Sequence, residues 1–283
     1  MKRLALLLAA MGIVTVGAAA AELKVANFGQ TVEIENTSGT KQGDIGDTWL
    51  FNNLGMTYGD WTFSIVGGKM WTLDSEGGVD GSNSRVQMSA VKNYGNYYLG
   101  VKTRFQQDYD RYHLLAGWNY GDFYGDFDVW YQSQQGEGAA PDSFRYEIFP
   151  VGMKFGAFKA AWFVEGWEAT GNLTDAQQES YIGHQLRFYA PLYQGEKLTL
   201  TTEYRLSLTE DANYKEKQMH PEFKDFGRHR LYVRSNYAVS ESLSVFLNYG
   251  YQVSDYESVD GKGANTKSNK YWGDVEFGWN YKF

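Results

Sequence analysis

The sequence predicts an all-β protein: a transmembrane, antiparallel, up-and-down β-barrel of about fourteen strands. Three observations predict it. Apolar and polar residues alternate with the period of a β-strand through most of the chain. The connections between the alternating segments are short and long in turn, and charged residues are absent from one phase of the alternation.

The first observation is the alternation itself. Pro150 and Pro191 indicate a bulge and a strand end, because proline cannot donate a ladder hydrogen bond. The first, second, eighth and tenth segments are the least regular, so twelve and sixteen strands remain open. The segments span residues 24–36, 47–58, 61–71, 84–93, 97–105, 111–120, 123–133, 143–155, 158–170, 179–192, 198–208, 228–239, 243–253 and 271–283.

The second observation is the sorting of the connections by length. Transmembrane barrels have short periplasmic turns and long extracellular loops, and an even strand count leaves both termini on the periplasmic side. Short connections are predicted at 59–60, 94–96, 121–122, 156–157, 193–197 and 240–242, and long ones at 37–46, 72–83, 106–110, 134–142, 171–178, 209–227 and 254–270.

The third observation is the distribution of charge. In the clearest strands the apolar phase (for example Tyr97, Leu99 and Val101) carries no charged residue, although 21% of the chain is charged. A charge that faces lipid near the bilayer centre costs about 2–4 kcal/mol. The opposite phase is rich in charges, which a water-filled lumen tolerates and the core of a soluble sandwich does not.

This phase predicts the side chains that line the lumen. They are Lys102, Arg104, Asp126, Asp128, Glu165, Arg187, Glu203, Arg205, Arg228, Arg230, Arg234, Asp274 and Glu276. The five arginines from Arg187 onward form a ladder with two open interpretations, which are compatible. The ladder binds carboxylates or phosphates in transit, or it pairs with lumen acids and stiffens the wall.

The start of the chain predicts export. A basic start at Lys2 and Arg3 precedes an apolar run from Leu4 to Val16, which is shorter than the about 20 residues that a transmembrane helix needs. Small residues follow, so residues 1–21 are predicted to be a cleaved signal peptide, with cleavage after Ala21 or Ala20. Residues 22–283 are then one barrel domain, localised to a bacterial outer membrane.

Composition excludes several other functions. The net charge of −8 argues against a nucleic-acid partner. There is no cysteine, and no histidine pair has ligand spacing on one strand face, so we expect no disulfide, metal site or cofactor. The expected surroundings are outer-membrane lipid and lipopolysaccharide.

The last strand ends in Trp-Asn-Tyr-Lys-Phe, which resembles the terminal signature of bacterial outer-membrane barrels. More specifically, residues 186–192, 225–237, 242–249 and the final strand resemble the G-type monomeric porins and the related oligogalacturonate-porin family. The resemblance covers about 100 residues well and the remainder in pattern only. It implies fourteen strands, or twelve in the oligogalacturonate branch, a monomeric pore, and passive uptake of small solutes, mainly saccharides.

The expected function is therefore that of a porin for ions and small hydrophilic solutes, without enzymatic activity. The alternatives are a structural or adhesive barrel without an open pore, and an outer-membrane hydrolase, although no motif fixes a catalytic nucleophile. The longest connection, 209–227, is a candidate gate, with Lys217, His220 and His229 as its charged and titratable groups. An ordinary exposed loop is the alternative.

Overall fold

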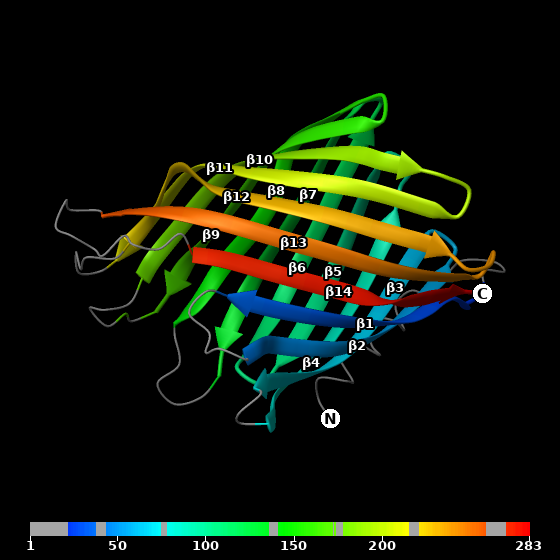
Figure 1. The fold of residues 1–283 in the computed structure, drawn as a ribbon, viewed down its shortest axis with the longest axis horizontal. Helices are drawn as coiled ribbons and strands as arrows, with labels where there is room; N and C mark the ends of the chain where they lie inside the picture. The colour runs from blue at the N-terminus through cyan, green and yellow to red at the C-terminus, as the bar shows by residue number, and fades with distance from the viewer. Residues whose placement is uncertain are drawn as a thin grey trace.

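Backbone pairing runs without interruption around a single closed sheet. The computed structural model describes residues 22–37, 44–74, 78–135, 141–171, 173, 178–214, 221–258 and 270–283. Each strand pairs antiparallel with the next in sequence, and the first pairs with the last, from Asn27 opposite Lys282 to Thr37 opposite Trp272 (Figure 1). The predicted fold class and the predicted fourteen strands are confirmed.

The strands are β1 (Lys24–Thr37), β2 (Asp44–Tyr58), β3 (Trp61–Asp74), β4 (Gly78–Asn93), β5 (Tyr97–Gln106), β6 (Tyr109–Tyr120), β7 (Phe123–Gln134), β8 (Asp142–Phe155), β9 (Phe158–Thr170), β10 (Gln178–Gln194), β11 (Leu198–Tyr214), β12 (Pro221–Ala238), β13 (Leu243–Ser258) and β14 (Lys270–Lys282). No helix of the described residues is long and apolar enough to cross a membrane.

Four strands extend at least five residues beyond their predicted bounds, all at the end of the barrel opposite the short turns. β4 and β12 begin earlier, and β11 and β13 end later, so much of the predicted loops 72–83, 209–227 and 254–270 is strand. These predicted loop boundaries were wrong. The physical reason is that a strand beyond the lipid meets water on both faces, so its sequence no longer alternates.

The short turns depend on glycine. In the two-residue turns that begin at Gly59 and Gly121, the glycine has a φ of 53° and 60°. The aspartate that follows each glycine is not among the residues with positive φ. Glycine at the first central position with positive φ is the requirement of a type II′ hairpin turn, whose twist matches that of the flanking strands. These turns therefore fix the register of their hairpins.

Both prolines singled out from the sequence coincide with irregular pairing. The β8–β9 register shifts between Ile148 and Val151, on either side of Pro150, as predicted for a bulge. The β10–β11 register shifts between Pro191 and Tyr193, and β10 continues to Gln194. Pro191 therefore marks a bulge near the strand end rather than the end itself.

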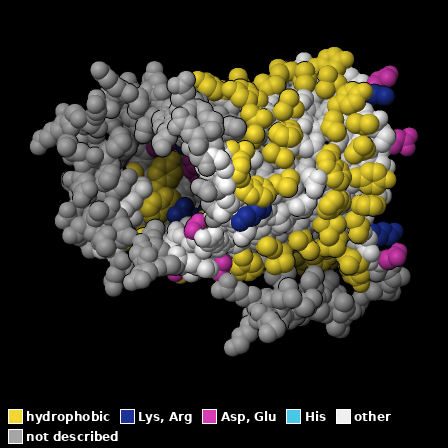
Figure 2. Space-filling view, turned by 60° about the horizontal axis from the view of Figure 1, so that its bottom comes forward, with side chains coloured by type: hydrophobic (Ala, Val, Ile, Leu, Met, Phe, Trp, Pro, Cys, Tyr) yellow, Lys and Arg dark blue, Asp and Glu magenta, His cyan; other side chains and the backbone are white. Residues whose placement is uncertain are grey.

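The burial pattern is the reverse of that in a soluble protein. Among the described residues, thirteen polar or charged side chains are buried, compared with eight hydrophobic ones. Exposed apolar side chains follow the predicted outward phase: Leu99 is 51% exposed, Leu114 64% and Leu247 54%. Figure 2 shows hydrophobic side chains over much of the described outer surface on this face, with charged side chains toward the two ends of the barrel. The outer face is therefore suited to lipid.

A matched pair of substitutions on β6 tests this two-faced wall. Leu114 is exposed on the outer face, and its neighbour Leu115 pairs in register with the inward residue Asp128. We expect Leu114→Lys to lower the free energy of unfolding in a lipid bilayer by about 2–4 kcal/mol. Leu115→Lys should cost less than half as much, because its ammonium group enters a polar lumen. Equal losses in a urea titration would contradict the assignment of the two faces.

Candidate functional site

The inner wall of the barrel is identified by contacts between strands that are not neighbours in the sheet. Lys102 Nζ on β5 lies 2.5 Å from Asp128 Oδ2 on β7, and the Tyr98 hydroxyl on β5 donates to Asp126 on β7. Side chains from alternate strands can meet only on the concave face of a curved sheet. Tyr98 reaches across because β6 has Gly117 beneath its ring, where a Cβ atom would overlap it.

Arginine dominates this wall. All nine arginines after residue 21 lie in described strands, and their register positions place them on the inner face. They are Arg85, Arg104, Arg111, Arg145, Arg187, Arg205, Arg228, Arg230 and Arg234. The predicted arginines are therefore part of a larger set that extends from β4 to β12.

Five of these arginines are held by a neutral amide. The Nε–H group of each donates to the Oε1 atom of a glutamine, and no ion pair holds these five in the part of the chain that the structure describes. The pairs are Arg85–Gln106 (3.0 Å), Arg104–Gln87 (3.1 Å), Arg111–Gln132 (2.7 Å), Arg187–Gln185 (3.2 Å) and Arg230–Gln252 (2.7 Å). A glutamine orients the guanidinium group without cancelling its charge.

Aromatic rings support the same guanidinium groups. Arg187 lies 3.3 Å from the ring centroid of Phe163, Arg230 lies 4.1 Å from that of Trp272, and Arg85 lies 4.3 Å from that of Trp49. Stacking of this kind restrains the planar group and adds a cation–π attraction. In these three arginines the amide and the ring together therefore restrain the guanidinium group.

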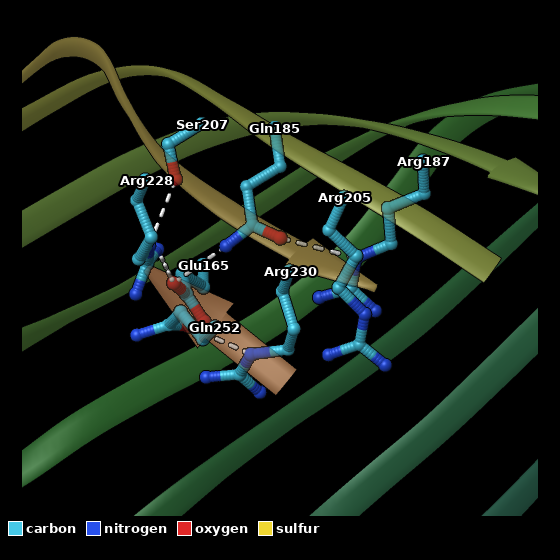
Figure 3. Close-up of a pocket in the computed structure, with 8 residues that line it drawn as sticks. All are labelled: Glu165, Gln185, Arg187, Arg205, Ser207, Arg228, Arg230 and Gln252. Atoms are coloured by element: carbon cyan, nitrogen blue, oxygen red, sulfur yellow. Dashed lines mark hydrogen bonds and ion pairs between the residues drawn. The ribbon is translucent and has the colours of Figure 1, made fainter. Parts of the chain in front are cut away.

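A second group of arginines is paired with acids. Arg228 Nη2 lies 2.8 Å from Glu165 Oε1 across the lumen, from β12 to β9, and Arg228 also pairs with Glu210. Glu203 receives both Arg205 and Arg234, each at 2.5 Å. The cavity beside them is lined by Glu165, Gln185, Arg187, Arg205, Ser207, Arg228, Arg230 and Gln252 (Figure 3). Paired and glutamine-held arginines therefore stand side by side.

Arg228 follows a strained stretch of backbone. Phe226 has a φ of 58°, the only positive value at a described residue other than glycine, and the β12–β13 register shifts between Phe223 and Arg228. A bulky residue in this region is unfavourable by about 1–3 kcal/mol and persists only where its surroundings enforce it. Arg228 contacts Glu165, Glu210 and Ser207, and these contacts help to hold the neighbouring backbone in this conformation.

Four further acids are gathered where β14 meets β1. Asp274 and Glu276 lie on β14, and the register places Glu35 and Glu33 of β1 directly opposite them. Asp126 and Asp128 stand apart from this group, on β7, with Tyr98, Lys102 and His113 as partners. The lumen therefore has an acidic seam where β14 meets β1 and an arginine-rich wall from β4 to β12.

The structure places the predicted lumen residues of β5, β7, β9, β10, β11, β12 and β14 on the inner face, in the contacts given above. Prediction missed Arg85, Arg145, Glu33 and Glu35 as site residues. One signal could have revealed two of the glutamine pairs. The patterns Arg85-Val86-Gln87 and Arg104-Phe105-Gln106 lie on adjacent antiparallel strands, where each arginine meets the glutamine of the other.

The predicted gate is not supported where the structure describes it. Lys217 and His220 lie outside the described residues. His229 lies within β12, opposite Leu206 and Val253, and its Nδ1 is 2.7 Å from the hydroxyl of Tyr204 on the outer face. The assignment of His229 to a gate was wrong, because its position between the inward residues Arg228 and Arg230 turns its side chain away from the lumen.

A closed sheet with an apolar exterior and a charged interior defines a transmembrane β-barrel. No protein-family model and no curated protein sequence matches the chain. Among solved structures, the chain is similar to outer-membrane expressed OmpT of Vibrio cholerae, with 13% identity, a TM-score of 0.49, and coverage of 95% of this chain and 99% of that one.

Two further solved structures are similar. For an anion-selective porin from Comamonas acidovorans the identity is 12%, the TM-score 0.46, and the coverage 93% of this chain and 100% of that one. For the CymD monoaromatic hydrocarbon channel the identity is 7%, the TM-score 0.49, and the coverage 94% and 89%. At these low identities the assignment of the chain to the transmembrane β-barrels rests on its own closed sheet, apolar exterior and charged inner wall.

Arg228 provides a test of the paired group. We expect Arg228→Met to lower the free energy of unfolding by about 1–3 kcal/mol, because it leaves Glu165 and Glu210 without their common cation. Adding Glu165→Gln and Glu210→Gln should restore most of the loss. The matched control is Arg104→Met, which removes a glutamine-held arginine and should cost less. A denaturant titration in which the triple variant is no more stable than Arg228→Met would refute this account of the cluster.

Proposed function

We propose that the chain is a bacterial outer-membrane porin, which conducts ions and small hydrophilic solutes by passive diffusion and prefers anions, including saccharides that carry carboxylates. The observation that carries the proposal is the set of five guanidinium groups held by glutamine. Among the described residues no carboxylate forms an ion pair with them. A guanidinium group binds carboxylate or phosphate in a bidentate manner.

The expected size of the pore fits small solutes. Fourteen strands spaced about 4.8 Å apart and tilted by about 40° form a backbone cylinder roughly 28 Å across. Inward side chains narrow this to about 10–15 Å, which admits sugars and excludes folded proteins. No chemical step is required, because the wall supplies water, charge and hydrogen-bonding groups while the solute moves down its gradient.

The location follows from the same physics. Closed up-and-down barrels with an even strand number, short turns at one end and an apolar outer band are the architecture of bacterial outer membranes. Export through the predicted signal peptide of residues 1–21, which lie outside the described residues, would deliver the chain there. We propose a monomer, as the resemblance to the G-type porins implies.

Both alternatives lack support from the inner wall. A blocked structural barrel would need a lumen filled by apolar groups, whereas inner rings such as Phe163 and Trp272 lie against guanidinium groups. A hydrolase would need a nucleophile beside the pair formed by His113 Nδ1 and Asp128 Oδ1 at 2.6 Å. In the described structure Nε2 of His113 is buried and has no hydrogen-bond partner, so the pair lends a hydrolase no support.

Single-channel recording of the refolded chain in a planar bilayer tests the proposal. We expect discrete current steps of one size and, under a salt gradient, a reversal potential on the anion side. Steps in groups of three would keep the pore and reject the monomer. Silence from a protein shown to be folded and inserted would reject the porin.

The arginine wall makes a sharper prediction. Arg230→Ala combined with Arg234→Ala should lower the ratio of anion to cation permeability at least about twofold, because two positive charges leave the lumen. The matched control is Glu203→Gln combined with Arg234→Ala, which removes one charge of each sign from a pair at 2.5 Å. The control should leave the reversal potential near that of the unaltered protein. The same reversal potential for both double variants would remove anion selectivity from the proposal.

A further inference from the structure

The seam between β1 and β14 presents a cluster of acids that form no ion pair with a base among the described residues. Glu33 lies directly opposite Glu276, and Glu35 directly opposite Asp274, at consecutive inward positions of the two strands. Like charges directly opposite each other destabilise a sheet. Four carboxylates in this arrangement therefore either bind protons or need a compensating positive charge.

Several other acids that line the lumen have a cationic partner. Asp128 pairs with Lys102, Glu165 and Glu210 pair with Arg228, and Glu203 pairs with two arginines. None of the four seam acids has an ion-pair partner among the residues that the structure describes. The four seam acids therefore lack the ion pairs that these other acids have.

The nearby arginines are engaged elsewhere. Arg230 donates from Nε to Gln252 and from Nη1 to the Tyr232 hydroxyl, and it stacks on Trp272. Arg85 donates to Gln106 and stacks on Trp49. Neither side chain supplies the missing contact to a seam carboxylate.

Asp274 gives an independent indication of a missing ligand. Asp274 is only 7% exposed. Its Oδ1 atom is buried and has no hydrogen-bond partner among the described residues. Leaving a buried charged acceptor unsatisfied is costly, by several kcal/mol in the least favourable case. Asp274 belongs to the same cluster as the half-buried Glu33 and Glu276.

The geometry fits one cation. One carboxylate oxygen from each of Glu33, Asp274 and Glu276 lies within 4.8 Å of the other two. Calcium–oxygen distances are about 2.3–2.6 Å, so two oxygens on opposite sides of one calcium ion are separated by about 4.8 Å. Asn248 Nδ2 donates to Oε2 of Glu276 at 2.8 Å and so restrains that ligand.

We propose that Glu33, Asp274 and Glu276 bind a divalent cation, with Ca²⁺ preferred, at the seam where the barrel closes. Calcium accepts flexible sets of oxygen ligands and completes its shell with water, whereas Mg²⁺ demands a tighter octahedron at about 2.0–2.1 Å. The ion joins the first strand to the last and balances the repulsion between their carboxylates. It binds to the barrel whether or not the lumen conducts.

Terbium luminescence tests the site directly. Tb³⁺ replaces Ca²⁺ in oxygen-ligand sites, and Trp49 lies opposite Glu33 in the β1–β2 register, where its indole can sensitise the ion. We expect the refolded chain in a neutral detergent to give sensitised Tb³⁺ emission that Ca²⁺ displaces at lower concentrations than Mg²⁺. Asp274→Asn should lower the affinity at least about tenfold, because the ion loses its most buried carboxylate.

The matched control is Glu147→Gln. Glu147 is an inward carboxylate between Asp128 and Glu165 in the register of β7, β8 and β9, so the control removes the same charge from the opposite wall. It should retain the emission and the Ca²⁺ displacement. Equal emission from Asp274→Asn and the unaltered protein, or no saturable binding to either, would overturn the site.

Thermal unfolding supplies a second readout. Ligands that bind only the folded state raise Tm. We expect Ca²⁺, compared with a chelator, to raise the Tm of the unaltered protein and of Glu147→Gln but not that of Asp274→Asn. Removing one repelling carboxylate should leave Asp274→Asn at least as stable as the unaltered protein in chelator, so this variant is expected to fold. A rise in Tm of equal size in all three proteins would place the effect of Ca²⁺ elsewhere.

Discussion

The constraint on which the structure depends is that lipid offers no hydrogen bonds to the backbone. Each N–H and C=O group within the bilayer must be paired inside the protein, and a sheet meets this requirement only by closing on itself. Closure brings β1 onto β14 over eleven register positions, from Asn27 to Thr37. It also gives each strand one face toward lipid and one toward the lumen, so the period-two pattern, the apolar belt and the charged wall share one cause.

The inner wall of this closed sheet holds guanidinium groups in place without neutralising their positive charge. A carboxylate partner would fix a guanidinium group but cancel its field. Glutamine and a flat aromatic ring fix it and leave the field intact, as Arg187 between Gln185 and Phe163 illustrates. The acid-paired arginines, with Arg228 as their centre, serve the opposite purpose and join distant strands across the lumen.

The same physics explains what the sequence could reveal. Strand number, phase and most lumen residues were predictable because lipid imposes a strict alternation on residues such as Leu99 and Leu114. The ends of β11 and β12 were not, since no lipid acts there. Glu33 was missed as a site residue because its place beside the acids of β14 depends on the register between β1 and β14, which no local sequence pattern encodes. A search for histidine and cysteine spacing likewise overlooks a site made of carboxylates from opposite ends of the chain. His229 was assigned to a gate from its place beside a loop, although the phase of its neighbours already turned it outward.

The two charged regions of the lumen act together. Arginines on β4 to β12 face acids on β14 and β1, so a field crosses the pore, and a solute with separated positive and negative groups would orient in it. An ion bound at the seam would weaken the acidic side and leave the arginine side unchanged, so the lumen as a whole would become more favourable to anions. Because the seam acids also lie where the barrel closes, closure and charge selectivity would respond to the same cation. The buried carboxylate of Asp274 thereby links the stability of the fold to the composition of the solution that fills it.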